Sequence, residues 1–569
     1  MAKERRFSTL LHRKATRLGR RNWFGLKWDV WSVVTLAAFA FLTFFVVYPL
    51  VSLLLNSFYD QTGKLTLGNY WEFLRLKYYY SALFNSFKIS ILATLFAVLI
   101  GLPLAYLSTR YQIRGKGALN ILVILSLMSP PFIGAYSWIL LLGNNGVITR
   151  LLHSIGIPFT SIYGWQGIVF VFALQFYPHI YLYVSGALRT ADSSLEEAAE
   201  SLGMPAWRRL LTVTLPLVLP TLSAGTLLVF MESFADFGTP MLLGQGYKVM
   251  PVLAYEQFIN EMGGNMSMAS TVSALMIVCS TLALFVQRFV SSRKNYATSG
   301  MRIAKVKPLS RKKSWLFTII AFVPASISIL PQATVIYTSF LERKGPVFHR
   351  GFSLDSYIQI GYKVQKAITN TFSFSLMAMG IIIVMGVLIS YVLVRRASRL
   401  TAFLDGLIMI PYIIPGTVLG ISLIIAFNKP PIILTGTWII IVIAYVARKI
   451  SYTVRSSVGI LQQLDRSVEE ASISLGVPPM KTFFKTTVRL MIPGVMSGAI
   501  ISWVAVINEL STSIVLYHGA TATISVSIYS EVFSSNYGTG AALATILSVC
   551  TIISLIIANC LSRDSRTIA

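Results

Sequence analysis

The chain has 569 residues, of which 55% are hydrophobic and only 12% charged, whereas soluble domains carry about 25% charged residues. Its length alone would suggest about three or four soluble domains, but it has too little charge to cover a soluble surface. We therefore expect a membrane protein. The net charge of +27 does not favour a nucleic-acid binder, which would place its Lys and Arg beside ordinary acidic residues.

Apolar runs of roughly 20 residues, the length that a membrane-spanning helix needs, recur along the chain. The sequence therefore predicts an all-α polytopic membrane protein with about 12 transmembrane helices. The first run is longer than the apolar region of a secretory signal, about 7–15 residues, so we expect an uncleaved helix there. The predicted spans are 31–58, 89–109, 119–142, 164–188, 213–236, 266–286, 315–340, 371–394, 403–427, 436–460, 489–511 and 532–562.

Positive charge gathers in two segments that flank the first six spans. Residues 1–30 hold nine Lys or Arg, and residues 287–314 hold nine more and no acid. Basic segments stay in the cytoplasm, so both are expected inside, with six crossings between them. We interpret the excess charge as a topological signal and as a contact for anionic membrane lipids, with no nucleic-acid partner.

The chain also repeats itself. An offset of 285 residues pairs Arg110 with Arg395, and after the third span an offset of 273 pairs Gly203 with Gly476. The second copy is thus 12 residues shorter, most simply in the outer loop 143–163. Six spans in each copy predict two parallel six-helix repeats about a pseudo-two-fold axis normal to the membrane.

These boundaries predict five parts of the chain. They are a basic cytoplasmic N-terminal segment (1–30), a first membrane half (31–290), a basic cytoplasmic linker (291–314), a second membrane half (315–562) and a cytoplasmic C-terminal tail (563–569).

The clearest local signal lies between the fourth and fifth spans. Ser194 followed by Glu197 has the spacing of a capping box, and Gly203, with Pro205 after it, marks the end of a helix. Acidic residues in the first turn suit the helix dipole. A short helix repeated with the same cap and stop favours a docking element for a symmetric partner over an ordinary interfacial helix. The second copy carries these features at Ser467, Glu470, Gly476 and Pro478.

The first copy, Glu197-Ala198-Ala199 with Gly203 and then Val213-Thr-Leu-Pro216, resembles the EAA signature of ATP-binding-cassette importer permeases. The second copy departs from it, because Ser472 replaces the second Ala and Arg489 stands where the proline would be. Over nearly its whole length the chain resembles the fused, twelve-span permeases of the ferric-iron type, in which one polypeptide supplies both membrane halves.

This resemblance implies a type I importer permease fold in a bacterial cytoplasmic membrane, with the N- and C-termini in the cytoplasm. It implies a dimer of cytosolic ABC ATPase subunits and an extracytoplasmic solute-binding protein as partners. Ferric iron is the implied cargo; phosphonate, sugar phosphate, thiamine and polyamine are alternatives from close relatives of that type. The residues that it assigns to ATPase coupling are Glu196, Glu197, Ala198, Ala199, Gly203, Glu469, Glu470, Ala471, Ser472 and Gly476.

No enzyme motif accompanies these features. The sequence contains no GxxxxGK[ST] phosphate loop, no HExxH and no GxSxG, so we expect a transport subunit with no catalytic residues. We expect no cofactor in this chain, with ATP and Mg held by the partner ATPase. We interpret His179, in the fourth span, as a satisfied polar residue rather than a ligand. A secondary transporter or channel would explain the spans and the repeat but not the paired docking helices.

Polar residues inside spans are costly, so four of them are candidates for a translocation path or gate. The 273 offset pairs Asp236 with Glu509, and Glu232 lies about 28 Å along its helix, towards the outer face. Two readings stay open: the acids build the gate, by capping loops or pairing with Lys or Arg, or they contact a hard cation such as ferric iron. No metal site is assigned. The four candidates are Glu232, Asp236, Asn508 and Glu509.

Overall fold

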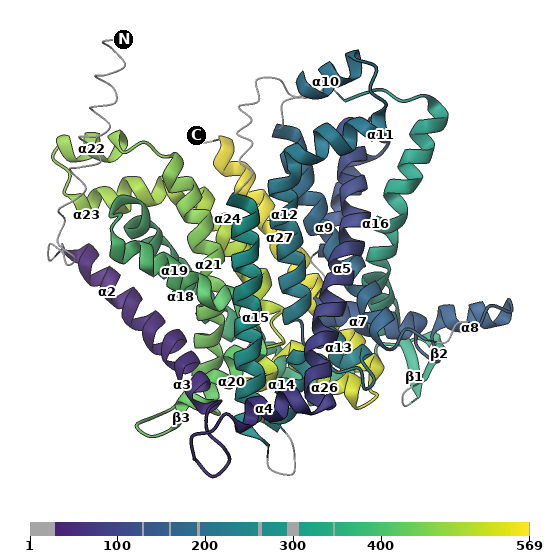
Figure 1. The fold of residues 1–569 in the computed structure, drawn as a ribbon, viewed down its shortest axis with the longest axis horizontal. Coiled ribbons are helices and arrows are strands. Elements are labelled where there is room, and N and C mark those ends of the chain that lie inside the picture. The colour runs from purple at the N-terminus through teal and green to yellow at the C-terminus, as the bar shows by residue number, and fades with distance from the viewer. Residues whose placement is uncertain are drawn as a thin grey trace.

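The fold is a bundle of long helices that run side by side (Figure 1). The computed structural model describes residues 29–127, 130–158, 161–190, 194–259, 264–292, 306–344 and 347–567. Within these residues ten helices are long and apolar enough to cross a membrane, and one bent pair adds an eleventh crossing. The protein is therefore an all-α polytopic membrane protein. Most of the two basic segments, residues 1–28 and 293–305, lies outside the described residues.

The first half begins with a long helix made of α2, the π-turn η1 and α3, and it ends with α15. Its elements are α2 (Val30–Leu42), η1 (Thr43–Val47), α3 (Tyr48–Asn56), α4 (Gly68–Arg75), α5 (Lys77–Arg110), α6 (Lys116–Leu127), α7 (Pro131–Leu142), α8 (Val147–Ser154), α9 (Trp165–Thr190), α10 (Ser194–Ser201), α11 (Ala206–Arg209), η2 (Leu210–Thr214), α12 (Leu215–Ala235), α13 (Gly238–Leu243), α14 (Met250–Ile259) and α15 (Met266–Ser292).

The second half repeats this order from α18 onward and adds two short antiparallel hairpins, β1–β2 and β3–β4. Even the π-turns η2 and η3 recur at the 273 offset. Its elements are α16 (Arg311–Ser339), β1 (Leu341–Lys344), β2 (Val347–Phe352), α17 (Asp355–Lys363), α18 (Gln365–Arg395), α19 (Arg399–Ile413), α20 (Gly416–Phe427), β3 (Asn428–Lys429), β4 (Ile432–Ile433), α21 (Trp438–Gln463), α22 (Ser467–Ser474), α23 (Pro479–Thr482), η3 (Phe483–Thr487), α24 (Val488–Ile507), α25 (Ser513–Leu516), η4 (Gly519–Thr521), α26 (Ile524–Phe533) and α27 (Tyr537–Thr567).

Two predicted spans are not single straight helices. The span 403–427 is broken into α19 and α20, which meet at 108°. Pro415 stands at the break with an extended backbone, because proline has no N–H for the preceding turn and restricts the residue before it. Pro130 takes the same position before α7, so the span 119–142 is likewise divided into α6 and α7.

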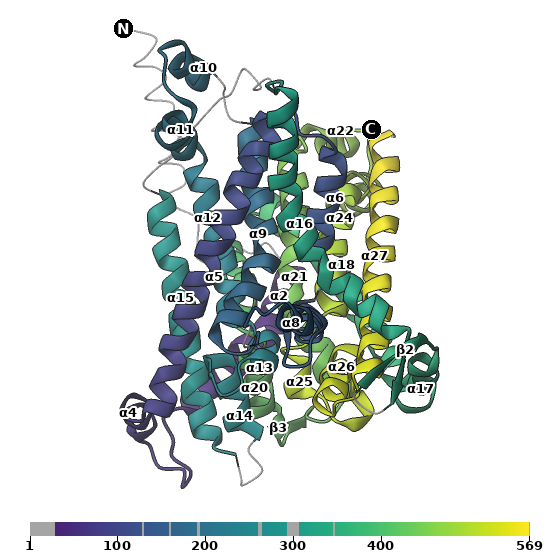
Figure 2. The ribbon, with the colours of Figure 1, turned by 90° about the vertical axis from the view of Figure 1, so that its right-hand side faces the viewer.

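The outer loop 143–163, where the first half is longer, contains α8. This helix runs across the direction of the long helices and is seen end-on in Figure 2. The second half has the β3–β4 hairpin in its place. The extra residues of the first copy therefore form a separate side-pointing helix.

The two halves interlock through the first helix of each. Trp31 on α2 packs against Tyr391 of α18, with ring centroids 4.2 Å apart, and against Phe483 of η3. In the other direction α16 reaches the first half, where Gln332 donates a hydrogen bond to the Leu125 carbonyl at 2.8 Å. Figure 1 shows α2 beside α18 and α19, and α16 on the far side near α5 and α9. Each half therefore depends on the other for its packing.

Small residues bring the long helices close together at matching places. A Cβ added to Gly101 on α5 would lie 2.7 Å from the Tyr177 carbonyl of α9, and one on Gly386 of α18 would lie 2.8 Å from Cγ2 of Thr453 on α21. Close helix contacts of this kind are the usual way in which membrane helices associate. The repeat pair Gly101 and Gly386 is thus explained by packing.

Candidate functional site: two docking helices and a gate between the halves

The short helices α10 and α22 lie at one end of the bundle, and α4, α14 and α17 lie at the other (Figures 1 and 2). Each short helix ends as the sequence predicts. Gly203 and Gly476 have φ of +77° and +85°, a conformation that side chains with a Cβ rarely adopt. In each copy the residue after the glycine donates its N–H to a carbonyl near the end of the helix. Met204 donates to the Ala199 carbonyl, and Val477 donates to the Ser472 carbonyl. We call α10 and α22 the docking helices.

The predicted capping box of the second docking helix is wrong. Ser467 is the first helical residue rather than the cap, and Asp465 takes the capping role by accepting a hydrogen bond from the Ser467 N–H at 2.9 Å. This bond holds the pKa of the Asp465 carboxyl below its usual value. Glu470 faces Arg466 at 3.4 Å instead of reaching back to the cap. The counterpart of Asp465, Asp192, lies outside the described residues.

The first glutamate of each motif fastens its docking helix to the bundle. Glu196 accepts a hydrogen bond from Arg110, the last residue of α5, at 2.8 Å, and Glu469 does the same from Arg395, the last residue of α18, at 2.9 Å. Both glutamates are buried. Each arginine also donates to a backbone carbonyl, that of Leu188 or Leu464. We name these pairs the docking anchors; the sequence had offered Arg110 and Arg395 only as repeat partners.

The outward faces of the docking helices carry exposed apolar side chains at matching positions. Leu202 and Leu475, related by the 273 offset, are each 85% exposed. The motif glutamates Glu197 and Glu470 are exposed as well. The two copies therefore present the same exposed apolar residue at the end of the short helix. Ala198 and Ala471 lie on the same exposed side.

The two docking helices are supported differently behind this surface. At α10, Glu200 pairs with Arg209 at 3.2 Å and with Lys307 of the linker. The hydrogen bond from Lys307 holds the pKa of Glu200 below its usual value. At α22 the hydroxyls of Ser472 and Thr482 lie 3.0 Å apart. Thr482, the counterpart of Arg209, therefore makes a neutral contact in the second copy, where Arg209 makes an ionic one in the first.

The candidate acids at the ends of α12 and α24 both accept a backbone hydrogen bond from the loop or short helix that follows. Asp236 accepts a hydrogen bond from the Thr239 N–H at 2.8 Å, and Glu509 accepts one from the Thr512 N–H at 3.1 Å. This is one of the two structural roles that the sequence left open. Asn508, beside Glu509, has a buried side-chain oxygen without a hydrogen-bond partner among the described residues.

Glu509 is also neutralised by two cations that sequence reasoning missed. Its carboxylate, only 5% exposed, pairs with Arg448 and with Lys449, whose Nζ lies at 2.8 Å. Both cations are on α21, inside the predicted span 436–460, where two adjacent charges in an apolar run were the available signal. Asp236 has no such cation partner among the described residues, and Gln175 occupies the position that corresponds to Arg448. The surroundings of these two candidate acids are therefore asymmetric.

The bend between α19 and α20 brings the start of α20 against these charges. A Cβ added to Gly416 would lie 2.7 Å from Arg448 Nη1 and 2.7 Å from Thr512 Oγ1. Only glycine leaves room for this approach. The bent helix, α21 and α25 thus meet at one point.

The remaining path candidate, Glu232 on α12, makes no ion pair within the part of the chain that the structure describes. Its charge acts on His179, Tyr412 and Tyr452. His179 forms no hydrogen bond with another described residue. No group of three or more His, Cys, Asp and Glu side chains that could hold a metal ion occurs in the described ranges.

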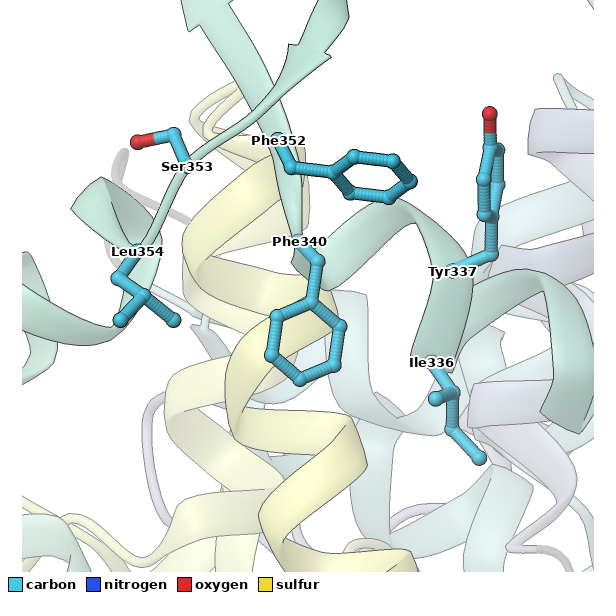
Figure 3. Close-up of a pocket in the computed structure, with 6 residues that line it drawn as sticks. All are labelled: Ile336, Tyr337, Phe340, Phe352, Ser353 and Leu354. Atoms are coloured by element: carbon cyan, nitrogen blue, oxygen red, sulfur yellow. The ribbon is translucent and has the colours of Figure 1, made fainter.

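A separate apolar pocket of about 310 Å³ lies at the C-terminal end of α16, away from the docking helices. Figure 3 shows Tyr337, Phe340 and Phe352 around it, contributed by α16 and the β1–β2 hairpin. Aromatic side chains at the end of a membrane helix are typical of the membrane–water interface. We therefore assign this pocket to the membrane boundary rather than to the path.

Comparisons with known proteins agree with this arrangement. The model of the binding-protein-dependent transport system inner membrane component family matches residues 94–296 and 382–567, more than half of the chain. The chain is 28% identical over 532 residues to the ferric transport system permease protein FbpB of Actinobacillus pleuropneumoniae, which covers 92% of this chain and 77% of that protein.

A shorter match is to the molybdenum transport system permease protein ModB of Escherichia coli K12, 36% identical over 160 residues, or 28% of this chain and 69% of that protein. A solved structure, a bacterial ABC transporter involved in the import of the acidic polysaccharide alginate, is 17% identical with a TM-score of 0.40 and covers 46% of this chain and 94% of that chain. With both halves matched in order by the family model, the chain belongs to the family of binding-protein-dependent transport system inner membrane components.

Proposed function

We propose that this chain is the membrane-spanning subunit of an ATP-driven importer and that its cargo is ferric iron. The single observation that carries the transport role is the pair of anchored docking helices at one end of the bundle. The cargo assignment is supported by the ferric transport relative, which matches 92% of this chain, both halves included. The basic segments support a cytoplasmic position for the docking helices and for both termini.

In this function each docking helix sits in one subunit of a cytosolic ATPase dimer. ATP and Mg bind to that dimer, and this chain performs no hydrolysis of its own. When the ATPase subunits move together, the docking anchors pass the movement to α5 and α18, because Glu196 and Glu469 are bonded to the last residue of each. An extracytoplasmic binding protein delivers the cargo at the opposite end.

An oxyanion is the second candidate cargo. One relative is named for molybdenum transport, and Arg448 and Lys449 place two cations beside the gate. Both cations already form ion pairs with Glu509, however, whereas Glu232 and Asp236 have no cation partner among the described residues. The balance of charges between the halves thus favours a cationic cargo.

The test is uptake into vesicles that contain this chain, its ATPase and its binding protein. We expect ATP-dependent accumulation of radiolabelled ferric iron and none of radiolabelled molybdate. Accumulation of molybdate instead of iron would overturn the cargo assignment and keep the importer. Equal uptake with and without ATP would overturn the importer.

A further inference from the structure

Four polar side chains between the halves have unused hydrogen-bonding groups. They are His179 on α9, Glu232 on α12, Tyr412 on α19 and Tyr452 on α21, and none of their side chains forms a hydrogen bond or ion pair with any described residue. An ionisable group inside a membrane span costs free energy, so such groups usually have a functional role. Four such groups without protein partners indicate a polar space or a ligand between the halves.

The four side chains belong to one place. The rings of Tyr412 and Tyr452 are 5.5 Å apart and nearly perpendicular. The charge of Glu232 acts on both phenols and on the His179 ring. His179 and Tyr452 are related by the 273 offset, so they occupy the same position in the two halves.

Two cations near this group, Arg448 and Lys449, are already engaged, because both pair with the Glu509 carboxylate. Glu232 itself forms no ion pair with a protein cation within the described residues. The matching position in the second half is Ala505, so the carboxylate comes from the first half alone.

The group offers one carboxylate oxygen donor, two phenol oxygens and one imidazole nitrogen. Oxygen-rich sets of this kind suit hard cations. We propose that Glu232, His179, Tyr412 and Tyr452 form a transit coordination site for ferric iron, an inference that rests on the proposed function. On binding, each phenol releases its proton, so that two phenolates and one carboxylate balance the three charges of the ion, and two protons leave to water.

The experiment uses the full chain with its ATPase in lipid nanodiscs, to which ferric citrate is added. Coordination by phenolate gives a visible ligand-to-iron charge-transfer band. We expect this band in the native chain, a weaker one in Tyr412→Phe and Tyr452→Phe, and none in the double variant. Tyr337→Phe, at the distant pocket of Figure 3, is the matched control and should keep the band.

Glu232→Gln, which keeps the shape of the side chain, should weaken iron binding by at least the roughly tenfold that loss of an outer-shell partner costs. Binding should release about two protons per ion, measured with a pH indicator. A full band in the double Phe variant, or unchanged affinity in both Glu232→Gln and His179→Ala, would overturn the site.

The uptake assay separates this inference from the proposed function. Iron uptake by the native complex without a band, or with the band unaffected by the Phe variants, overturns the site and keeps the function. Spermidine competing with iron, with no proton release on its own binding, would replace the metal site by a polyamine site held by Glu232 and the ring faces. Failure of the native complex to take up iron overturns the function.

Discussion

Removing one partner of a docking anchor should release the docking helix from the bundle. In Glu196→Ala, the Arg110 guanidinium stays buried with the Leu188 carbonyl as its remaining acceptor. Breaking a buried ion pair by removing one partner costs about 3–5 kcal/mol. Because the Glu196 side chain is 12% exposed, water recovers part of this cost, and we take about 3 kcal/mol. At 1.4 kcal/mol for each factor of ten, local opening of α10 should become about 100-fold more frequent.

Hydrogen–deuterium exchange of the backbone amides of α10 measures that opening directly. The same change should follow Glu469→Ala in α22, where Arg395 is left with the Leu464 carbonyl. The control is Arg396→Ala, which removes an exposed pair with Asp29 and should cost at most about 1 kcal/mol. If exchange in α10 rises no more in Glu196→Ala than in the control, the anchors do not hold the docking helices and the reasoning is refuted.

Other predictions concern the turns, the gate and the linker. Gly476→Ala should cost about 1–2 kcal/mol, because alanine must adopt a positive φ there; exchange in α22 measures this, and an unchanged rate would show that the helix end can relax. Gly416→Ala should abolish uptake while Gly406→Ala, with open space around its Cβ, should not, and equal uptake by both would rule out the packing argument. Glu509→Gln should lower the thermal stability of the complex by the cost of two buried cations left unpaired, several kcal/mol, whereas Lys449→Met should cost less; the reverse order would contradict the ion cluster. The pKa of Glu200 is below its ordinary value of 4.5, so its bond to Lys307 contributes fully above that pH and is lost as the pH falls through the lower folded-state pKa. Protection against exchange at residues 306–310, corrected for the pH dependence of the intrinsic exchange rate, should be constant from neutral pH down to about pH 5, and a loss near pH 7 would refute the assignment.

The sequence predicted the features that repeat. The lengths of the apolar runs predicted the spans, because each span must cross the same bilayer. The two sequence offsets predicted the parallel halves. Gly203 and Gly476 were readable as helix ends because a positive φ selects glycine. These signals are local, or are present twice.

The features that it did not predict depend on contacts between distant segments. The anchor between Arg110 and Glu196 joins residues 86 positions apart, and the sequence of neither segment indicates that the two are partners. The sequence left open whether Glu509 pairs with Lys or Arg or contacts a cation, and the partners Arg448 and Lys449 are seen only once α21 is packed against it. Ser467 appeared to be the cap because serine favours that position, but it is the first helical residue, and its own N–H donates to Asp465, two residues earlier. In each case tertiary packing decided between locally acceptable partners.

The mass of the purified complex tests the central claim most directly. The chain, solubilised and mixed with its ATPase, should bind two ATPase subunits, one at each docking helix. Glu197→Lys should reduce this to one, and Glu197→Lys together with Glu470→Lys should leave the chain alone, while the distant Glu342→Lys keeps both. Two ATPase subunits still bound to the double variant, with uptake intact, would contradict the account.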